Sequence, residues 1–211
     1  MKFIGTTSLV ALTLAFTAGC NKQAPTTPNY GDAINTYYQA HPACLWTDEK
    51  RFPIQAAPDD AKSQNLDALV DQGLLTRTTS EKKVIIISKR ENNYALSDKG
   101  RSAWTADPNQ PGYGNFCYGR RKVTTIDSNS PSSDQPGATV TVNYHYTLTG
   151  LPDWANAPET KTAFPQLQAA NNPQPASATL TNTTNGWQVT SAGNSSSTNN
   201  PATPADGKIV Q

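Results

Sequence analysis

The chain has 211 residues and a formal net charge of +1, so it lacks the basic excess that draws a protein to nucleic acid or to acidic lipid through charge alone. Hydrophobic residues make up 36% of the chain, and it contains 16 prolines. This composition predicts a core of about one domain to one and a half domains, joined by long polar connections.

The first twenty residues follow the order of an export signal. Lys2 precedes a short apolar run over residues 9–16, which is shorter than the roughly 20 residues of a membrane-spanning helix. The run ends in small residues before Cys20, which suit a peptidase groove. Residues 1–20 therefore resemble the signal peptide and lipobox of bacterial lipoproteins. The resemblance implies that residues 1–19 are removed and that Cys20 carries membrane lipid.

The residues after Cys20 bear on where such a protein would sit. Asn21 follows the cysteine, and by resemblance to the sorting rule of enteric lipoproteins a residue other than Asp implies the outer membrane, facing the periplasm. Residues 20–28 are rich in proline and polar residues, and we expect a lipidated tether there. The alternative is an ordinary signal peptide with a chance cysteine.

Two further cysteines remain, Cys44 and Cys117. An exported protein lies in an oxidising compartment, where a pair of thiols tends to form a disulfide. The alternatives are a redox pair or metal ligands, but these uses favour the close spacing of a Cys-x-x-Cys motif. We therefore predict a structural disulfide between Cys44 and Cys117, and no metal.

Two helices are predicted before the middle of the chain. The first runs from about residue 32 to 40, with Ile34, Tyr37, Tyr38 and His41 on one face. The second covers about residues 60–72. Gly73 is then placed as the left-handed residue after its end, and Leu74 should fold back on the helix.

A hairpin follows, in which residues 84–88 form one strand, residues 90–93 the turn and residues 94–96 the return strand. Ser97 would cap a short helix through Trp104. In this order, residues 60–104 resemble the recognition helix, wing and following helix of a winged-helix domain. Asp59, Asp60 and Asp67 make the front of the helix acidic, which argues against nucleic acid as a partner.

The C-terminal part is predicted as antiparallel sheet. Residues 139–149 alternate, with Val140, Val142, Tyr144, Tyr146 and Leu148 on the inward face. A final hairpin is expected around Asn185 and Gly186. The predicted fold class is thus α+β: a winged-helix-like half over residues 29–119, a small antiparallel sheet half over residues 120–190, one disulfide, and a disordered tail over residues 191–211.

The sequence contains no catalytic motif that we recognise, and we expect no cofactor. His41 and Cys44 have a ligand-like spacing, but His41 is also placed to end a helix. Aromatic residues gather in sequence around the two cysteines, either as core packed on the disulfide or as a groove for a glycan or peptide; they are Tyr37, Tyr38, Trp46, Tyr113, Phe116 and Tyr118.

Three functions remain open on the sequence. The one we expect is a non-enzymatic envelope lipoprotein that binds another envelope component, most simply a protein. A cell-envelope hydrolase with an unrecognised active site is the alternative. The third is a cytoplasmic regulator whose N-terminus only mimics an export signal.

Overall fold

The computed structural model describes residues 29–84, 87–131 and 133–194. Cys20, the predicted signal peptide and the predicted tether lie outside these residues. The helices are α1 (Tyr30–Ala40), α2 (Ala61–Asp71), α3 (Asp98–Ala103), α4 (Asp153–Asn156) and α5 (Pro158–Ala163), with a 3-10 turn at Pro165–Leu167. The strands are β1 (Ala43–Cys44), β2 (Lys50–Arg51), β3 (Ile54–Ala56), β4 (Leu75–Val84), β5 (Ile87–Leu96), β6 (Trp104–Ala106), β7 (Tyr113–Ser130), β8 (Thr139–Thr149), β9 (Gln174–Thr183) and β10 (Gly186–Asn194).

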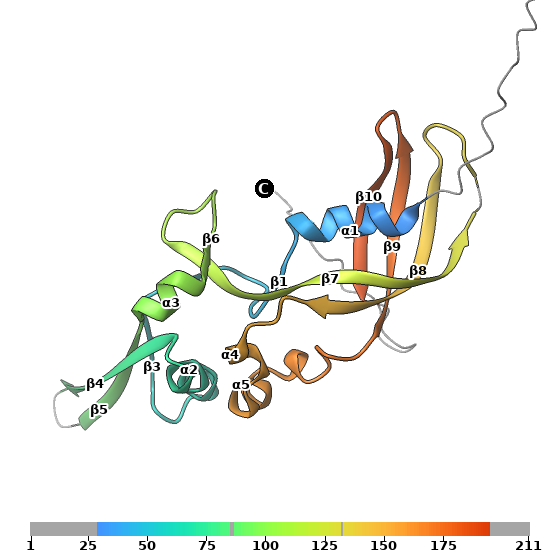
Figure 1. Ribbon diagram of the computed structural model, residues 1–211. Coiled ribbons are helices and arrows are strands. Elements are labelled where there is room, and N and C mark those ends of the chain that lie inside the picture. Colours follow the sequence, from blue (N-terminus) through green and yellow to red (C-terminus); the bar gives the residue numbers. More distant parts are fainter. Residues whose placement is uncertain (1–28, 85–86, 132, 195–211) are drawn as a thin grey trace, which may run out of the picture.

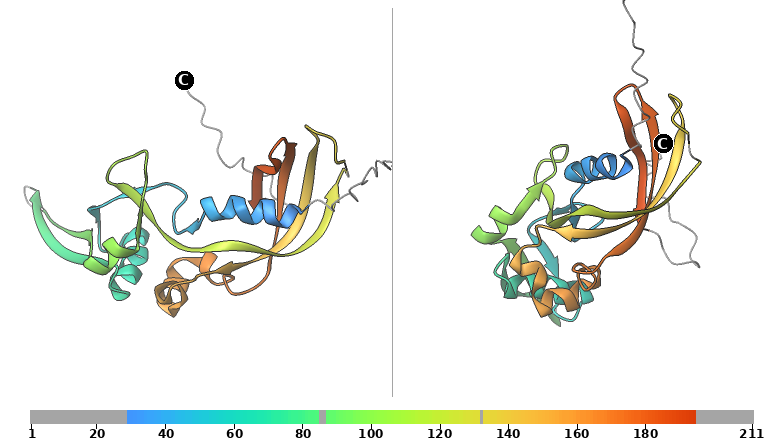
Figure 2. Two further views of the ribbon diagram at one scale, coloured as in Figure 1. Left: turned by 45° about the horizontal axis from the view of Figure 1, so that its top comes forward. Right: turned by 45° about the vertical axis from the view of Figure 1, so that its right-hand side comes forward.

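One antiparallel sheet organises the molecule. Its main path is β1-β7-β8-β9-β10, and the short strands β2 and β6 also pair with β7. The 18-residue strand β7 runs along the length of the molecule, and α1 lies across the sheet formed with β8, β9 and β10 (Figure 1). The register of β7 against β8 shifts twice, between Val123 and Thr125 and between Ile126 and Ser128. Such bulges bend a strand, and the turned views show the sheet curling around α1 (Figure 2).

The predicted winged-helix half is wrong. Strands dominate the described chain, and the sheet has seven strands rather than being a small C-terminal unit. Within residues 60–104 the helices are α2 and the six-residue α3, and the long hairpin β4–β5 pairs with β3 in a separate three-stranded sheet. The predicted division at residue 119 falls inside β7. The local helix–hairpin–helix order was present, but long-range strand pairing placed it in a different architecture.

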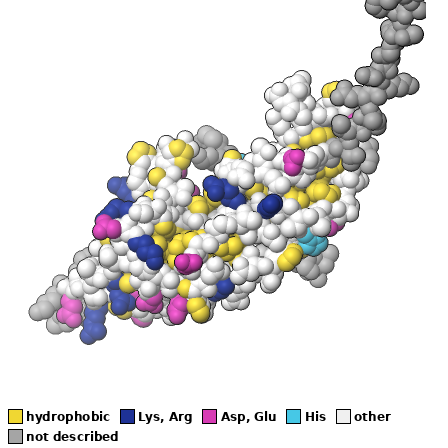
Figure 3. Space-filling model, viewed as in Figure 1, with side chains coloured by type: hydrophobic (Ala, Val, Ile, Leu, Met, Phe, Trp, Pro, Cys, Tyr) yellow, Lys and Arg dark blue, Asp and Glu magenta, His cyan; other side chains and the backbone are white. Residues whose placement is uncertain are grey.

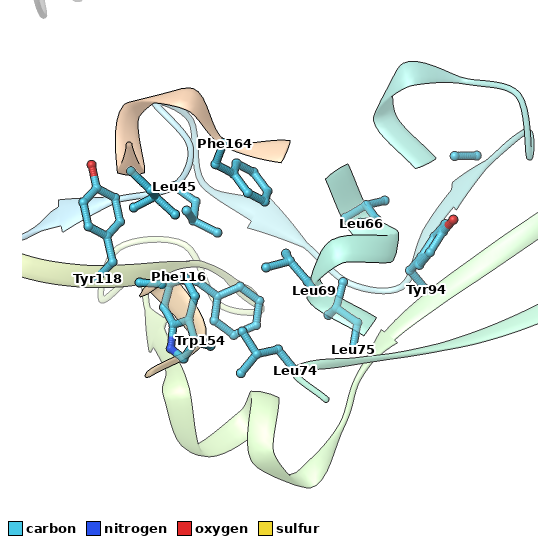
Figure 4. Close-up of a cluster of buried hydrophobic side chains, with 13 residues drawn as sticks. Leu45, Leu66, Leu69, Leu74, Leu75, Tyr94, Phe116, Tyr118, Trp154 and Phe164 are labelled. Carbon is cyan, nitrogen blue, oxygen red and sulfur yellow. The ribbon is translucent and has the colours of Figure 1, made fainter. Parts of the chain in front are cut away.

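Two hydrophobic cores lie along the molecule. In the first, Leu69 and Leu74 near α2 face Phe116 of β7 and Trp154 of α4 (Figure 4). In the second, α1 packs on the sheet; its buried residues are Tyr30, Ile34, Tyr38, Val140, Val142, Tyr144, Tyr146, Ala176, Ala178 and Leu180. Leu148 of β8 packs against both cores. Each core therefore combines N-terminal with C-terminal residues, so neither half of the sequence has a core of its own.

Several local predictions are confirmed. The helix predicted over about residues 60–72 is α2, and Asp60 stands at its start, where it accepts a hydrogen bond from the backbone of Lys62. At the other end Gly73 has φ +70°, and the Leu74 amide donates to the Leu69 carbonyl at 2.9 Å, which is the Schellman ending. Ser97 caps α3 through the Gly100 amide.

The hairpin differs from the prediction in the position of its turn. Residues 90–93, predicted to turn, lie inside β5, and Val84 pairs with Ile87. The Asn92 side chain explains why a turn-forming residue stands in a strand. Asn92 is buried, where it accepts a hydrogen bond from Thr79 and donates one to the Tyr94 hydroxyl. A cross-strand partner therefore overrides the turn preference of the residue.

The register predicted for the C-terminal sheet is confirmed. Val140, Val142, Tyr144 and Tyr146 are at most 3% exposed, and Leu148 is half-buried. The last hairpin also forms where expected, with Gly186 paired to Thr183. The tail was predicted from residue 191, but residues 191–194 belong to β10. The rest of the predicted tail, residues 195–211, lies outside the described residues.

Charge is distributed unevenly over the face of the molecule drawn in Figure 3. In the space-filling view charged side chains gather over the β4–β5 hairpin and α2, whereas the sheet end near β8–β10 is mostly uncharged (Figure 3). Among the described residues, no helix has the length and apolar character to span a bilayer.

Candidate functional site

A hollow of about 460 Å³ opens where β1, β6 and β7 meet. We call it the disulfide hollow, because both cysteines of the disulfide line it. Its walls are Ala40, His41, Pro42, Cys44, Trp46, Thr47, Glu49, Thr105, Ala106, Asp107, Pro108, Asn115 and Cys117. This size lies within the range of small-ligand sites in proteins.

The predicted disulfide is present. Cys44 of β1 lies directly opposite Cys117 of β7, with an S–S distance of 2.05 Å. The bond joins residues 73 positions apart in the sequence. It therefore fixes the short strand β1, and the chain that follows it, on the long strand β7.

Asn115 is the buried polar residue among those that line the disulfide hollow. It is 2% exposed, and its side chain makes two hydrogen bonds to the backbone of one residue, Trp46. The Trp46 amide donates to Asn115 Oδ1 at 3.2 Å, and Asn115 Nδ2 donates to the Trp46 carbonyl at 2.7 Å. This reciprocal pair of hydrogen bonds resembles the pair that two opposite residues exchange in an antiparallel sheet. It continues the contact between β1 and β7 beyond the disulfide.

Two carboxyl groups face the hollow, Glu49 and Asp107. Burial raises the pKa of the Glu49 carboxyl above its ordinary value, and the negative charge of Asp107 raises it further. The side-chain amide of Asn115 and the positive charge of Lys50 oppose this rise in the pKa of Glu49. One oxygen, Glu49 Oε2, is buried without a hydrogen-bond partner within the described part of the chain.

Asp107 is held by the connection between β6 and β7. Its backbone amide donates to the Tyr113 carbonyl at 2.9 Å, and its Oδ1 accepts from the Asn109 amide at 2.7 Å. The carboxylate is therefore positioned by its own loop, and no Lys or Arg is among the residues that line the hollow.

The aromatic residues predicted around the cysteines are mainly core, as the simpler interpretation held. Phe116 and Tyr118 are buried, and Tyr38 belongs to the second core. Trp46 differs, because it packs against four core rings yet lines the hollow; those rings are Phe52, Trp104, Phe116 and Phe164. Trp46 is therefore the aromatic wall that the groove interpretation required.

A second hollow of about 280 Å³ shares Trp46 with the disulfide hollow as a lining residue. We call it the lysine hollow, since Lys50 and Lys62 line it together with Ile54, Asn65 and Leu66. The charge around Trp46 thus changes sign, from carboxylates in one hollow to ammonium groups in the other.

The other predicted candidates have structural roles. His41 ends α1, where its ring stacks on Tyr37 and its Nδ1 lies 2.8 Å from the Tyr37 carbonyl. Asp60 is a helix cap, and Asp67 pairs with Arg77 at 2.8 Å, so the acidic front of α2 is partly neutralised. Among the described residues, no group of three or more His, Cys, Asp or Glu side chains could hold a metal ion.

The sequence patterns did not point to Glu49, Asp107 or Asn115. Asn115 had a usable signal: once Cys44 is set opposite Cys117 in antiparallel strands, Trp46 must lie opposite Asn115. Glu49 and Asp107 carry no such signal in the sequence, because they lie in irregular segments that meet only in the folded chain.

Comparison with protein-family models, with curated proteins and with solved structures gives no match for this chain.

Proposed function

We propose that this chain is an exported lipoprotein that is cleaved before Cys20 and held on the cell envelope by lipid on that cysteine. The folded domain from residue 29 onward acts, without catalysis, as a binding module for another envelope protein. Residues 20–28 serve as the tether, and the outer membrane facing the periplasm is the proposed location.

The observation that carries the proposal is the disulfide between Cys44 and Cys117. A structural disulfide suits an oxidising compartment and is rare in the cytosol, so it supports export and weighs against a cytoplasmic regulator. It agrees with the order of charge, apolar run, small residues and cysteine over residues 1–20.

The anchor is tested by labelling cells with radioactive palmitate. Wild-type protein should take up label, Cys20→Ala should not, and the paired control Cys44→Ala with Cys117→Ala should still be labelled. Label retained in Cys20→Ala, or an intact mass with an unmodified Met1, would overturn the proposal.

The partner is tested by crosslinking in intact cells. A photo-reactive amino acid at Thr47, which is exposed at the rim of the disulfide hollow, should capture one defined envelope protein. The same amino acid at Asn143, on the exposed face of β8, is the control. Equal capture at both positions would show that the hollow is not the binding surface.

A hydrolase acting on the cell wall is a second candidate, favoured by one observation. Glu49 and Asp107 are two carboxyls in one hollow, and the raised pKa of Glu49 suits a proton donor, as paired carboxyls do in glycoside hydrolysis. Purified protein should then release soluble fragments from peptidoglycan, and Glu49→Gln should abolish that release. No release by the wild-type protein would remove this candidate.

A further inference from the structure

We propose that the disulfide hollow binds an organic cation, the ammonium or guanidinium group of a basic side chain on the partner protein. The inference rests on the proposed function, since it states which chemistry of the partner the module recognises. Its three supports are the charge of the hollow, its aromatic wall and the unpartnered oxygen of Glu49.

The first support is charge. Glu49 and Asp107 face the hollow, and no Lys or Arg lines it. The remaining titratable group, His41, is held by its own helix end. Lys50, whose positive charge acts on Glu49, does not line this hollow but the lysine hollow, which also has Trp46 in its wall. The hollow therefore presents negative charge that its own walls do not balance.

The second support is the wall. Trp46 lines the hollow beside the carboxyls, and an indole face attracts a desolvated cation more strongly than the other aromatic rings do. The two hydrogen bonds from Asn115 hold the Trp46 backbone, and the four surrounding rings restrict its side chain. A wall fixed before binding loses little conformational entropy when a ligand arrives.

The third support is Glu49 Oε2, which is buried without a partner in the described chain. Keeping a carboxyl oxygen away from both water and a donor is unfavourable to the fold. An N–H donor from an ammonium or guanidinium group bound in the hollow that Glu49 lines would satisfy this oxygen. A group that is costly to the fold and satisfied by a ligand is typical of a binding site.

A basic side chain fits these features better than other cations. The hollow offers room for an aliphatic stem against Trp46, with the charge at the carboxyls. A bare divalent ion would gain nothing from the aromatic wall, and the described side chains do not form a group of ligands for a metal.

The test uses the full-length, lipidated protein in detergent micelles, labelled with ¹⁵N. The probe is a blocked Ala-Lys-Ala tripeptide, and its neutral counterpart has norleucine in place of lysine. The lysine peptide should shift the indole N–H signal of Trp46, while the signal of Trp187, on β10, stays in place. Equal shifts with the norleucine peptide would overturn the proposal.

Three variants test whether the carboxylates of the hollow bind the lysine peptide. Glu49→Gln and Asp107→Asn should each weaken binding of the lysine peptide at least about tenfold, the effect of losing a charged hydrogen bond. Asp48→Asn removes the same charge one residue away from Glu49 but outside the hollow, and should bind as the wild type does. Equal weakening by all three would show a general charge effect and overturn the site.

Two further measurements are needed. One distinguishes a free amine from a basic side chain as the ligand, and the other distinguishes this inference from the lipoprotein proposal. If cadaverine, a free diamine, binds as tightly as the lysine tripeptide, the ligand of the hollow is a free amine. That result would overturn the proposal that the ligand is a side chain of the partner protein. Loss of crosslinking at Thr47 in Glu49→Gln, with palmitate labelling unchanged, supports a basic side chain. Unchanged crosslinking in that variant would overturn the inference and leave the lipoprotein proposal standing.

Discussion

The hydroxyl of Tyr38 on α1 lies 2.8 Å from the hydroxyl of Tyr144 on β8, and both rings are buried. Burial, and then the hydrogen bond to Tyr38, raise the pKa of the Tyr144 phenol. Arg121 of β7 donates to the Tyr38 hydroxyl at 3.0 Å and lies over the rings of Tyr38 and Tyr146. These contacts join α1 to three residues of the central sheet.

The contacts of Arg121 should therefore be visible in stability. Arg121→Ala removes one charged hydrogen bond and two cation–π contacts, and should lower the free energy of unfolding by about 2–3 kcal/mol. Tyr144→Phe removes one hydroxyl and should cost about 1 kcal/mol. Urea unfolding measures both. Lys122→Ala, at the exposed neighbouring position, should stay within about 0.5 kcal/mol of the wild type.

A second polar network joins α2 to the hairpin. The Tyr94 hydroxyl donates to Asp67 at 2.8 Å and accepts from Asn92 at 3.2 Å, and the Tyr94 ring is fully buried. Tyr94→Phe leaves the buried Asn92 amide short of a partner and should cost about 1–3 kcal/mol in urea unfolding. The matched control is Tyr113→Phe, which keeps the ring under Arg51 and should change stability little.

Two glycines should respond differently to the same substitution. At Gly100 an added Cβ would lie 1.8 Å from the Leu74 carbonyl oxygen, so Gly100→Ala forces the backbone apart and should cost more than about 3 kcal/mol. At Gly73 the space is open apart from the Lys99 side chain, and only the left-handed conformation opposes Ala, at about 1–2 kcal/mol. Similar thermal midpoints for the two variants would contradict this account of Gly100.

Glu49 should make stability depend on pH. Because its folded pKa is raised above the value of 4.5 that it has when unperturbed, the folded state holds its proton longer than the unfolded state does. The contribution of Glu49 to stability therefore falls as pH rises from about 4.5, the ordinary glutamate value, toward the folded pKa. Gln at position 49 does not titrate, so Glu49→Gln lacks this loss of stability at higher pH. Its thermal midpoint should therefore exceed that of the wild type at pH 7 and be closer to it at pH 4. Asp48→Asn, which shares the charge change, should not show this difference.

The disulfide should contribute strongly to stability. It closes a loop of 73 positions, for which the chain-entropy model gives about 4 kcal/mol before any native strain. The variant carrying both Cys44→Ala and Cys117→Ala should unfold at lower urea concentration by an amount approaching this value. Its loss should also loosen Trp46, because β1 and Asn115 together hold that residue on β7. A Trp46 indole signal that keeps its position and width in the double variant would contradict the second expectation.

Some features were determined by the sequence itself, because they depend on interactions within a few residues. The alternation of Val140, Val142, Tyr144 and Tyr146 set the inward face of β8, since side chains alternate across any strand. Asp60, Gly73 and Ser97 marked helix ends, because caps and left-handed turns need particular residues close by. The disulfide followed from there being one pair of cysteines after Cys20 and from the compartment inferred for it.

The architecture was decided only in three dimensions. Residues 60–104 carry the local order of a winged helix, yet β7 draws β1, β2 and β6 into one sheet with β8–β10, and α1 packs against strands that lie more than 100 residues later. Pairings of this kind depend on complementary surfaces far apart in the chain, which local pattern does not encode. The same holds for the candidate site: Glu49 and Asp107 share a hollow only because the pairing of β1, β2 and β6 with β7 brings two irregular segments together.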